Sequence, residues 1–268
     1  MTANALELSW EIDGKKGAPV MVLGHSLGTD RSMWSGQREA FEASYRVLQL
    51  DLRGHGASPV PGGPYEIEDL AADVLRVADR AGLSSFIYCG SSLGGVVGLF
   101  LAARHPERID ALVAANTGAK IGTEAGWNER ISLVRSSGLA GLSETAIERW
   151  LAPTFRASNP STVDSLRQAF RRTPTEGYAG CCAALATADL RDELAGIRTP
   201  TLIIAGELDV ATPVRDAELL HAGIPGSRLV VLPSAAHLSN IDQRGSFNAA
   251  VHDFLNECTG RRTGPQAS

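Results

Sequence analysis

Ser92 is the residue whose type and setting point most clearly to chemistry. It lies at the centre of Gly90-Ser91-Ser92-Leu93-Gly94, between an apolar run over residues 86–89 and a helix-like run over residues 96–101. A G-x-S-x-G pentapeptide between a strand and a helix is typical of a nucleophile elbow, whose tight turn strains the serine backbone and exposes its hydroxyl. The two glycines would keep the strand and the helix from colliding. The motif predicts Ser92 as a nucleophile that attacks a carbonyl carbon in a hydrolytic reaction.

A serine hydroxyl is a weak nucleophile at neutral pH, so Ser92 needs a general base, and the base needs an acid to orient it. His237 follows the apolar run Arg228–Leu232, and Asp209 follows the apolar run Thr201–Gly206. The carboxyl ends of parallel strands meet at one edge of a sheet, where Ser92 is also expected. We therefore predict His237 as the base and Asp209 as the acid.

The sequence leaves an alternative open for each of these two partners. Glu207 lies closer to the end of its apolar run than Asp209 and is the rival acid. Asp209 would otherwise serve only to cap the helix that begins near Pro213. His237 would otherwise be an ordinary loop histidine with satisfied hydrogen bonds.

The negative charge of a tetrahedral intermediate requires an oxyanion hole built from N–H donors. One donor is expected to be the backbone N–H of Leu93, directly after the nucleophile and at the start of a helix. The second is expected from the loop His25-Ser26-Leu27-Gly28, which follows another apolar run. We predict the amide of Leu27, with that of Ser26 as the alternative. Because main-chain groups donate, the positions of these residues matter more than their side chains.

The other histidines are predicted to have structural or surface roles. His25 and His55 lie in turn sequences and are expected to brace loops by hydrogen bonding. His105 precedes a proline at a helix end, where a positive charge suits the helix dipole. His221 and His252 fall on predicted helices.

Strands that alternate with helices must position these residues. The segments with strand-like patterns are Leu6–Ile12, Pro19–Leu23, Arg46–Leu50, Phe86–Cys89, Ile109–Ala115, Thr201–Gly206 and Arg228–Leu232. Helical patterns occur at Ile67–Ala81 and, at the end of the chain, at Gly245–Glu257. Because several strands are apolar throughout, this alternation predicts an α/β fold with a mostly parallel sheet that helices cover on both faces.

The pattern changes after Asn116, where a long stretch contains only helical segments. These segments are Asn128–Arg135, Glu144–Trp150, Thr162–Phe170 and Gly177–Thr187. A helical insertion between two parts of a sheet predicts a cap over the active site. We divide the chain into the first part of the core (1–117), the cap (118–196), the second part of the core (197–258) and a flexible tail (259–268), which is polar and contains Gly and Pro.

Composition is that of an ordinary globular protein, with 268 residues, 44% of them hydrophobic and 21% charged. The formal charge of −5 argues against nucleic acid as a partner. No apolar run approaches the roughly 20 residues of a membrane span. The four cysteines have no metal-ligand spacing, so we expect reduced thiols, a cytoplasmic protein and no metal.

The motifs together resemble the α/β-hydrolase fold superfamily, over the chain up to about Glu257. The resemblance rests on the loop His25-Ser26-Leu27-Gly28, the turn Asp51-x-Arg53-Gly54-His55-Gly56-x-Ser58, the elbow, Gly206-x-x-Asp209 and His237. The turn is normally architectural in this superfamily, so Asp51, Arg53 and His55 receive no catalytic role. A serine at position 92 argues against dehalogenases and epoxide hydrolases, whose elbow carries aspartate.

Within that superfamily the chain resembles the 3-oxoadipate enol-lactonases. The segments that carry this resemblance are residues 25–30, 116–122, 127–131 and 237–241. Ser91 is a departure, since many relatives have a larger or apolar residue before the nucleophile. The resemblance implies hydrolysis of the enol-lactone to 3-oxoadipate in the β-ketoadipate pathway of aromatic catabolism, through an acyl-enzyme and without a metal or cofactor.

The implied substrate is a small lactone that carries a free carboxylate, which an acidic protein must bind with a local cation. Arg130 and Arg135 are the candidate cations, and Trp127 and Trp150 are candidate apolar walls. Arginines on cap helices are often solvated, and tryptophans often pack within a cap, so these alternatives stay open.

Two other functions also fit the sequence. One is a different ester or lactone hydrolase, or a cofactor-free perhydrolase, with the same triad. The other is a ligand-sensing signalling protein that retains the triad and turns over slowly. The sequence leaves open the oligomeric state and the branch of the pathway that supplies the substrate.

Overall fold

A single mostly parallel sheet organises the part of the chain that the structure describes, which is residues 6–262 of this computed structural model. Seven strands lie there in the order β1-β3-β2-β4-β5-β6-β7, and only β1 runs antiparallel to its neighbour. The strands are β1 (Trp10–Gly14), β2 (Val20–Gly24), β3 (Arg46–Leu50), β4 (Phe86–Ser91), β5 (Ile109–Ala115), β6 (Thr201–Gly206) and β7 (Arg228–Leu232). The predicted α/β class is confirmed.

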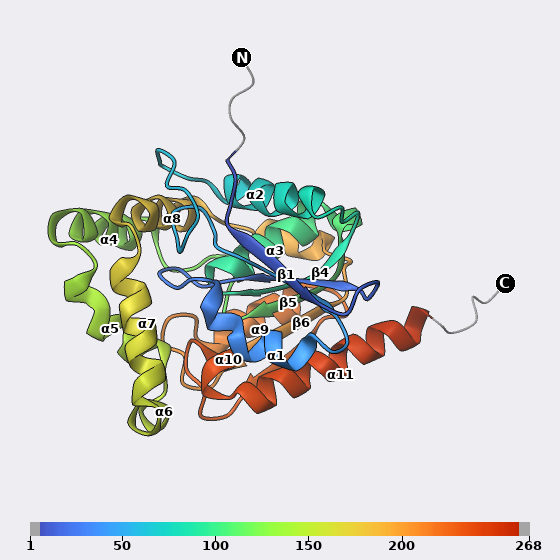
Figure 1. Cartoon of the computed structure of the whole chain (residues 1–268). Helices are drawn as coiled ribbons and strands as arrows, with labels where there is room; N and C mark the ends of the chain where they lie inside the picture. The colour runs from blue at the N-terminus through green and yellow to red at the C-terminus, as the bar shows by residue number, and fades with distance from the viewer. Residues whose placement is uncertain (1–5, 263–268) are drawn as a thin grey trace, which may run out of the picture.

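Helices cover both faces of this sheet, as Figure 1 shows. On one face lie α2 (Ile67–Arg80) and α3 (Leu93–Arg104), and on the other lie α1 (Ser35–Phe41) and α11 (Arg244–Arg262). Strands β2, β4 and β6 are buried along their whole length. Burial on both sides explains why these strands are continuous apolar runs rather than alternating patterns. The edge strand β1 is only half-buried and starts later than its weak pattern predicted.

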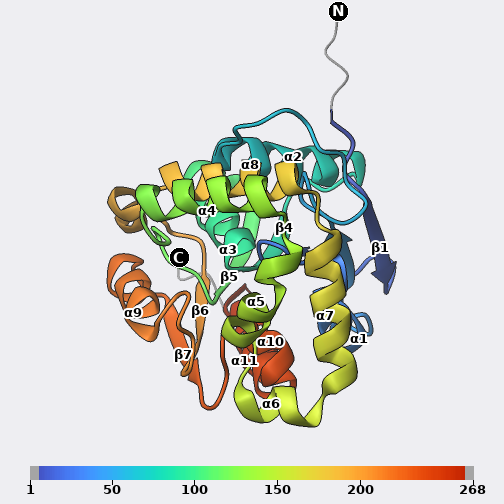
Figure 2. The same ribbon diagram turned by 90° about the vertical axis from the view of Figure 1, so that its left-hand side faces the viewer.

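A cap of helices connects β5 to β6, and among the described residues it contains no strand. Its helices are α4 (Glu124–Ser137), α5 (Ser143–Trp150), α6 (Pro153–Ser158), α7 (Pro160–Arg172) and α8 (Thr175–Thr187). Figure 2 shows α4 lying along α8, and α5 and α7 below them. Helix α4 begins four residues before the predicted Asn128, because Thr123 caps it by accepting the N–H of Gly126.

The remaining elements lie in the core, except η3, which lies between α4 and α5 in the cap. They are the 3₁₀ turns η1 (Arg31–Trp34), η2 (Pro106–Arg108), η3 (Ala140–Leu142) and η4 (Arg191–Gly196), with helices α9 (Val214–Gly223) and α10 (Ser239–Asp242). Helix α11 continues to Arg262, so residues 259–262 of the predicted tail are helical, and the rest of that prediction, residues 263–268, lies outside the described part. Over residues 6–262 we find no helix with the length and apolar character of a membrane span.

Candidate active site

Ser92 occupies a sharp turn between β4 and α3. Its backbone has φ 53° and ψ −113°, a conformation that a residue with a side chain rarely adopts. A Cβ at Gly90 would lie 2.2 Å from the carbonyl oxygen of Gly94, and a Cβ at Gly94 would lie 2.2 Å from that of Gly24. Gly90 therefore lets the strand and helix approach, as predicted, whereas Gly94 makes room for the neighbouring strand β2.

Hydrogen bonds from the next strand hold the turn in this conformation. The N–H of Ser92 donates to the carbonyl of Ala115 at 2.9 Å, and the hydroxyl of Thr117 donates to the carbonyl of Ser92 at 2.8 Å. Both partners lie at the carboxyl end of β5. The serine thus stands at the carboxyl edge of the sheet, where it lines a cavity of about 130 Å³ between core and cap.

His237 lines the same cavity, and Asp209 lies behind it. Nδ1 of His237 is 2.8 Å from Oδ2 of Asp209, and both side chains are almost fully buried. Because Nδ1 faces the carboxylate, Nε2 is the ring nitrogen left to act on the cavity side. Glu207 instead accepts the backbone N–H of Ser234 at 2.8 Å and is exposed. The structure therefore brings Asp209, and not Glu207, to the histidine.

Several donors keep the carboxylate of Asp209 ionised. Its Oδ1 accepts the N–H groups of Ala211 (2.8 Å) and Thr212 (3.0 Å), and its Oδ2 accepts the Thr212 hydroxyl (2.8 Å). Burial by itself raises the pKa of Asp209, but His237, Thr212 and Asn116 outweigh it and lower the pKa to about 2. A carboxylate that stays ionised can hold the Nδ1 proton of His237 and stabilise the imidazolium when it forms.

The sequence reasoning missed Asn116, which sits directly after β5. Its Nδ2 donates to Oδ2 of Asp209 at 3.0 Å and to the carbonyl of Ala236 at 3.2 Å, while its Oδ1 accepts the hydroxyl of Ser239 at 2.5 Å. Its φ of 46° lies in the left-handed region, which asparagine tolerates better than most residues. In the sequence Asn116 directly follows a predicted strand. A polar asparagine at that position was the signal that could have pointed to a role in the site.

One predicted oxyanion donor, Leu93, lies within the elbow directly after Ser92, and the other, Leu27, lies in the loop that follows β2. Neither the Leu27 N–H nor the Leu93 N–H donates to another residue in the described part of the chain. The alternative donor, the Ser26 N–H, is directed at the sulfur of Met33 at 3.3 Å. This geometry favours Leu27 over Ser26, and Leu27 also lines the cavity.

His25 and His55 brace the loops around the site, as predicted. Nε2 of His55 accepts the N–H of Gly28 at 3.0 Å, and Nε2 of His25 accepts the N–H of Leu52 at 2.9 Å. An Nε2 that accepts a hydrogen bond carries no proton, so both rings are neutral. Burial, reinforced by the neighbouring His25, lowers the pKa of His55 to about 3. These two rings hold the loop that carries Leu27 against the turn after β3.

The cap supplies two arginines to the cavity, and one of them was not predicted. Arg130 and Arg149 both line it, and neither side chain forms an ion pair or hydrogen bond with another described residue. Burial raises the pKa of the nearby Tyr178 phenol, and both guanidinium groups act against that rise. Arg135 is a correction: it pairs with Glu176 at 2.9 Å on the surface, where both side chains are more than half exposed.

Aromatic side chains form much of the cavity wall. Trp127 and Trp150 both line it, as predicted. The indole N–H of Trp127 donates to the carbonyl of Ile121 at 2.6 Å, which fixes the start of the cap. Trp150 packs edge-on against Phe170 at 5.5 Å, and Phe170 packs in the same way against Tyr178 at 5.7 Å. These rings therefore serve both as cap packing and as an apolar wall.

The chain is similar to known proteins over most of its length. The model of the alpha/beta hydrolase fold family matches residues 19–243. The 3-oxoadipate enol-lactonase 2 of Acinetobacter baylyi is 41% identical, over 95% of this chain and 95% of its own length. The 3-oxoadipate enol-lactonase 1 of the same organism is 40% identical, over 92% of each chain. Among solved structures, the enol-lactonase from Burkholderia xenovorans LB400 has a TM-score of 0.92 and 41% identity, covering 94% of this chain and 98% of that one.

Proposed function

Because this chain belongs to the alpha/beta hydrolase fold family, we propose that it hydrolyses 3-oxoadipate enol-lactone to 3-oxoadipate through a serine acyl-enzyme. One observation carries the proposal at the level of the site. A single cavity is lined by a serine in a nucleophile elbow, by a histidine paired with a buried carboxylate, and by two arginines that have no acidic partner among the described residues. This combination suits an ester of a small carboxylic acid.

In the acylation step Ser92 attacks the lactone carbonyl while Nε2 of His237 accepts its proton. The tetrahedral oxyanion is held by the N–H groups of Leu27 and Leu93. When the intermediate collapses, the ring C–O bond breaks and an enolate leaves, which conjugation stabilises. His237 returns its proton to the enolate, which then becomes a ketone. The conversion of enol to ketone drives the step forward.

In the deacylation step water replaces the leaving group. His237 accepts a proton from the water, the resulting hydroxide attacks the acyl carbonyl, and the same oxyanion hole stabilises the second intermediate. Collapse breaks the bond to Ser92, which regains its proton from His237. Asp209 stays ionised throughout and holds the imidazole in the required orientation. Every proton is accounted for by His237, so these steps require no cofactor.

The carboxylate of the substrate is bound by the cap in this proposal. Arg130 reaches the cavity from α4 and Arg149 reaches it from α5, so two cations converge on it from different helices. Guanidinium groups bind carboxylates through paired hydrogen bonds, and partial burial strengthens the attraction. Trp127 and Trp150 would enclose the apolar part of the ring. The net charge of −5 makes such local cations necessary for an anionic substrate.

Steady-state hydrolysis of freshly generated 3-oxoadipate enol-lactone tests this proposal, with p-nitrophenyl acetate as the comparison ester. We expect kcat/KM of about 10⁴ M⁻¹s⁻¹ or more for the lactone, which is within the enzymatic range, and much lower values for the ester. A preference for the ester would retain the triad and remove the lactone as substrate. Slow turnover of both would point to a ligand-sensing role.

We also propose that the enzyme acts in the cytoplasm. Cys89, Cys181 and Cys182 are buried free thiols. Such thiols are typical of proteins from reducing compartments.

A further inference from the structure

We propose that Asp242 is a positioning residue that ties the loop carrying His237 to the cap. Its carboxylate oxygen Oδ2 accepts the backbone N–H of Ala236 at 2.7 Å and the backbone N–H of Ala152 at 3.0 Å. Ala236 directly precedes His237, and Ala152 connects α5 to α6 in the cap. One oxygen atom therefore joins two segments that are 84 residues apart in sequence (236 − 152).

A second hydrogen bond joins the other side of His237 to the same part of the cap. The N–H of Leu238 donates to the carbonyl of Trp150 at 2.8 Å. Both neighbours of His237 are thus linked to the end of α5 or to the segment directly after it. Trp150 lines the substrate cavity, so the position of the cavity wall and the position of the base depend on the same contacts.

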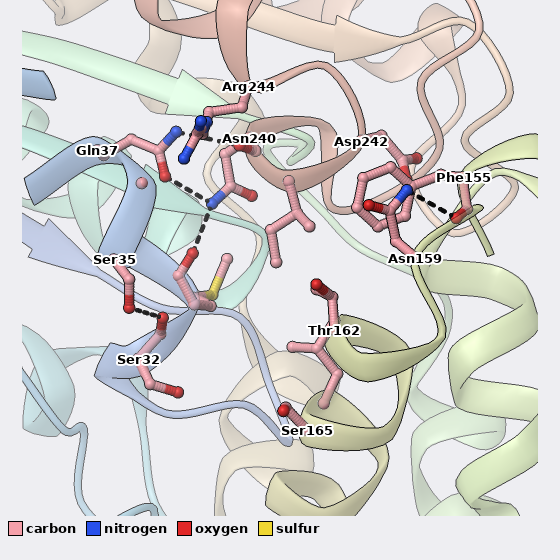
Figure 3. A pocket seen from close by; sticks show the side chains of 14 residues that line it. Ser32, Ser35, Gln37, Phe155, Asn159, Thr162, Ser165, Asn240, Asp242 and Arg244 are labelled. Atoms are coloured by element: carbon pink, nitrogen blue, oxygen red, sulfur yellow. Dashed lines mark hydrogen bonds between the residues drawn. The ribbon is translucent and has the colours of Figure 1, made fainter. Parts of the chain in front are cut away.

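Asp242 does not line the cavity that contains Ser92, and it acts there only through its neighbours. It faces a separate cavity of about 590 Å³ between core and cap, which Figure 3 shows. Gln37 and Asn240 lie on the core side of that view, and Phe155, Asn159 and Thr162 lie on the cap side. Oδ1 of Asp242 is buried there and has no hydrogen-bond partner among the described residues. The carboxylate is therefore held by its two backbone contacts alone.

The carboxylate of Asp242 is partly buried and is contacted by two N–H donors, without a directly paired cation among the described residues. Burial raises the pKa of Asp242 to about 6, while the N–H groups of Ala236 and Ala152 and the charge of Arg156 lower it. Arg244, which also lines the cavity, is directed to Glu39 at 3.5 Å. No cation pairs directly with Asp242 in the described part of the chain. Either protonation state leaves Oδ2 free to accept both N–H groups, so the contribution of Asp242 lies in its acceptor geometry.

This inference rests on the proposed triad, and a double-mutant cycle tests it. The variants are Asp242→Ala, Asp209→Asn and the two combined, assayed with both the lactone and p-nitrophenyl acetate. If Asp242 acts by holding His237 against Asp209, Asp242→Ala should lower kcat by about 10- to 100-fold in the wild-type background. Its effect should shrink to about threefold or less once Asp209 is replaced, because residues that act through one another are non-additive.

An equal loss from Asp242→Ala in both backgrounds would overturn the inference, because it would show that Asp242 acts independently of the His237–Asp209 pair. If instead Asp209→Asn itself had no effect on either substrate, the proposed triad would fail. The two failures are therefore distinguishable. Using both substrates keeps the test valid even if the lactone is not the preferred one.

Two further variants separate the acceptor from its charge and from general loss of structure. Asp242→Asn keeps an oxygen acceptor and should retain kcat within about threefold; a loss as large as that of Asp242→Ala would contradict the acceptor role. Glu207→Ala is the matched control. It removes a carboxylate that also accepts an N–H from this loop, at Ser234, but has no link to the cap. We expect a much smaller loss from it.

If Asp242→Ala does not fold, Ala152→Pro replaces it in the cycle. This change replaces the N–H on the cap side with a ring carbon, at a residue whose φ of −59° suits proline. The preceding Leu151, with φ −125° and ψ 138°, is also compatible. We expect Ala152→Pro to raise KM and lower kcat together, because the cavity wall and His237 are coupled. Unchanged KM and kcat would show that the link to the cap has no effect on the site.

Discussion

Asn116 donates a hydrogen bond through Nδ2 to Oδ2 of Asp209 at 3.0 Å, the same oxygen that lies 2.8 Å from Nδ1 of His237. The amide thus fixes one side of the carboxylate while the imidazole occupies the other. Through its second bond, to the carbonyl of Ala236, Asn116 also holds the residue before the histidine. The end of β5 therefore sets the geometry of two groups that follow β6 and β7.

Replacing Asn116 by alanine should weaken the orientation of both Asp209 and His237. We expect kcat to fall by about tenfold, with KM little changed. Alanine at φ 46° should also cost about 1 to 2 kcal/mol of folding free energy. Asn116→Gly is the matched control, since glycine tolerates that conformation. It should show the same loss of kcat with a smaller fall in Tm; full activity in both variants would contradict the role.

Replacing Asp209 by asparagine should remove the charge that stabilises the imidazolium. An amide also favours the wrong tautomer of His237, so we expect kcat to fall by about 10³- to 10⁴-fold. Glu207→Gln should change kcat by less than about threefold, because Glu207 accepts an N–H from Ser234 and does not contact the histidine. Steady-state kinetics of both variants decide between the two acids, and a larger loss for Glu207→Gln would reverse the assignment.

The stability of the protein should fall as the pH drops below about 6.5. His55 has a folded pKa of about 3, against an ordinary value of 6.5, so the unfolded chain binds more protons between these two values. The contribution of His55 to the free energy of unfolding is therefore complete above pH 6.5 and is lost progressively towards pH 3. The fall in Tm from pH 7 to pH 5 should be smaller in His55→Gln, which cannot titrate. An identical pH dependence would assign the effect to other groups.

The two cavity arginines should affect binding more than chemistry. Arg130→Ala and Arg149→Ala should each raise KM for the lactone by about tenfold, with kcat changed by less than about threefold. Neither should alter KM for p-nitrophenyl acetate, which carries no carboxylate. Arg135→Ala is the control, because Arg135 pairs with Glu176 away from the cavity. Equal effects at all three positions would indicate general electrostatics instead of a binding site.

The sequence was sufficient to predict the residues that follow strands. Ser92, Asp209 and His237 each come after an apolar run, and parallel strands must bring such positions to one edge of the sheet. Strand-like runs predicted β3, β5, β6 and β7 with their observed bounds. Each of these four strands can be recognised from the residue types within its own short segment. They were predictable because this signal does not depend on distant parts of the chain.

The cap was harder to interpret because its residues are placed by contacts between helices. Arg130 and Arg135 are five residues apart on α4, which puts them about 140° apart around the helix axis. They cannot both face one cavity, and helical periodicity could have shown this. Which of them faces inwards depends on how α4 packs along α8. Arg149 was missed for a related reason: it points into the cavity from α5 only because α5 packs against α7.

Turnover of 3-oxoadipate enol-lactone by the Ser92→Ala variant, beside the wild type, tests whether Ser92 is the nucleophile of a lactone hydrolase. Ser92 is only 6% exposed, and alanine fits the same space, so the variant should fold with an unchanged circular dichroism spectrum and a similar Tm. We expect fast hydrolysis by the wild type and, for the variant, a loss of at least about 10³-fold in kcat with no acyl adduct in rapid-quench mass spectrometry. A variant that folds and still hydrolyses the lactone at the wild-type rate would contradict this expectation.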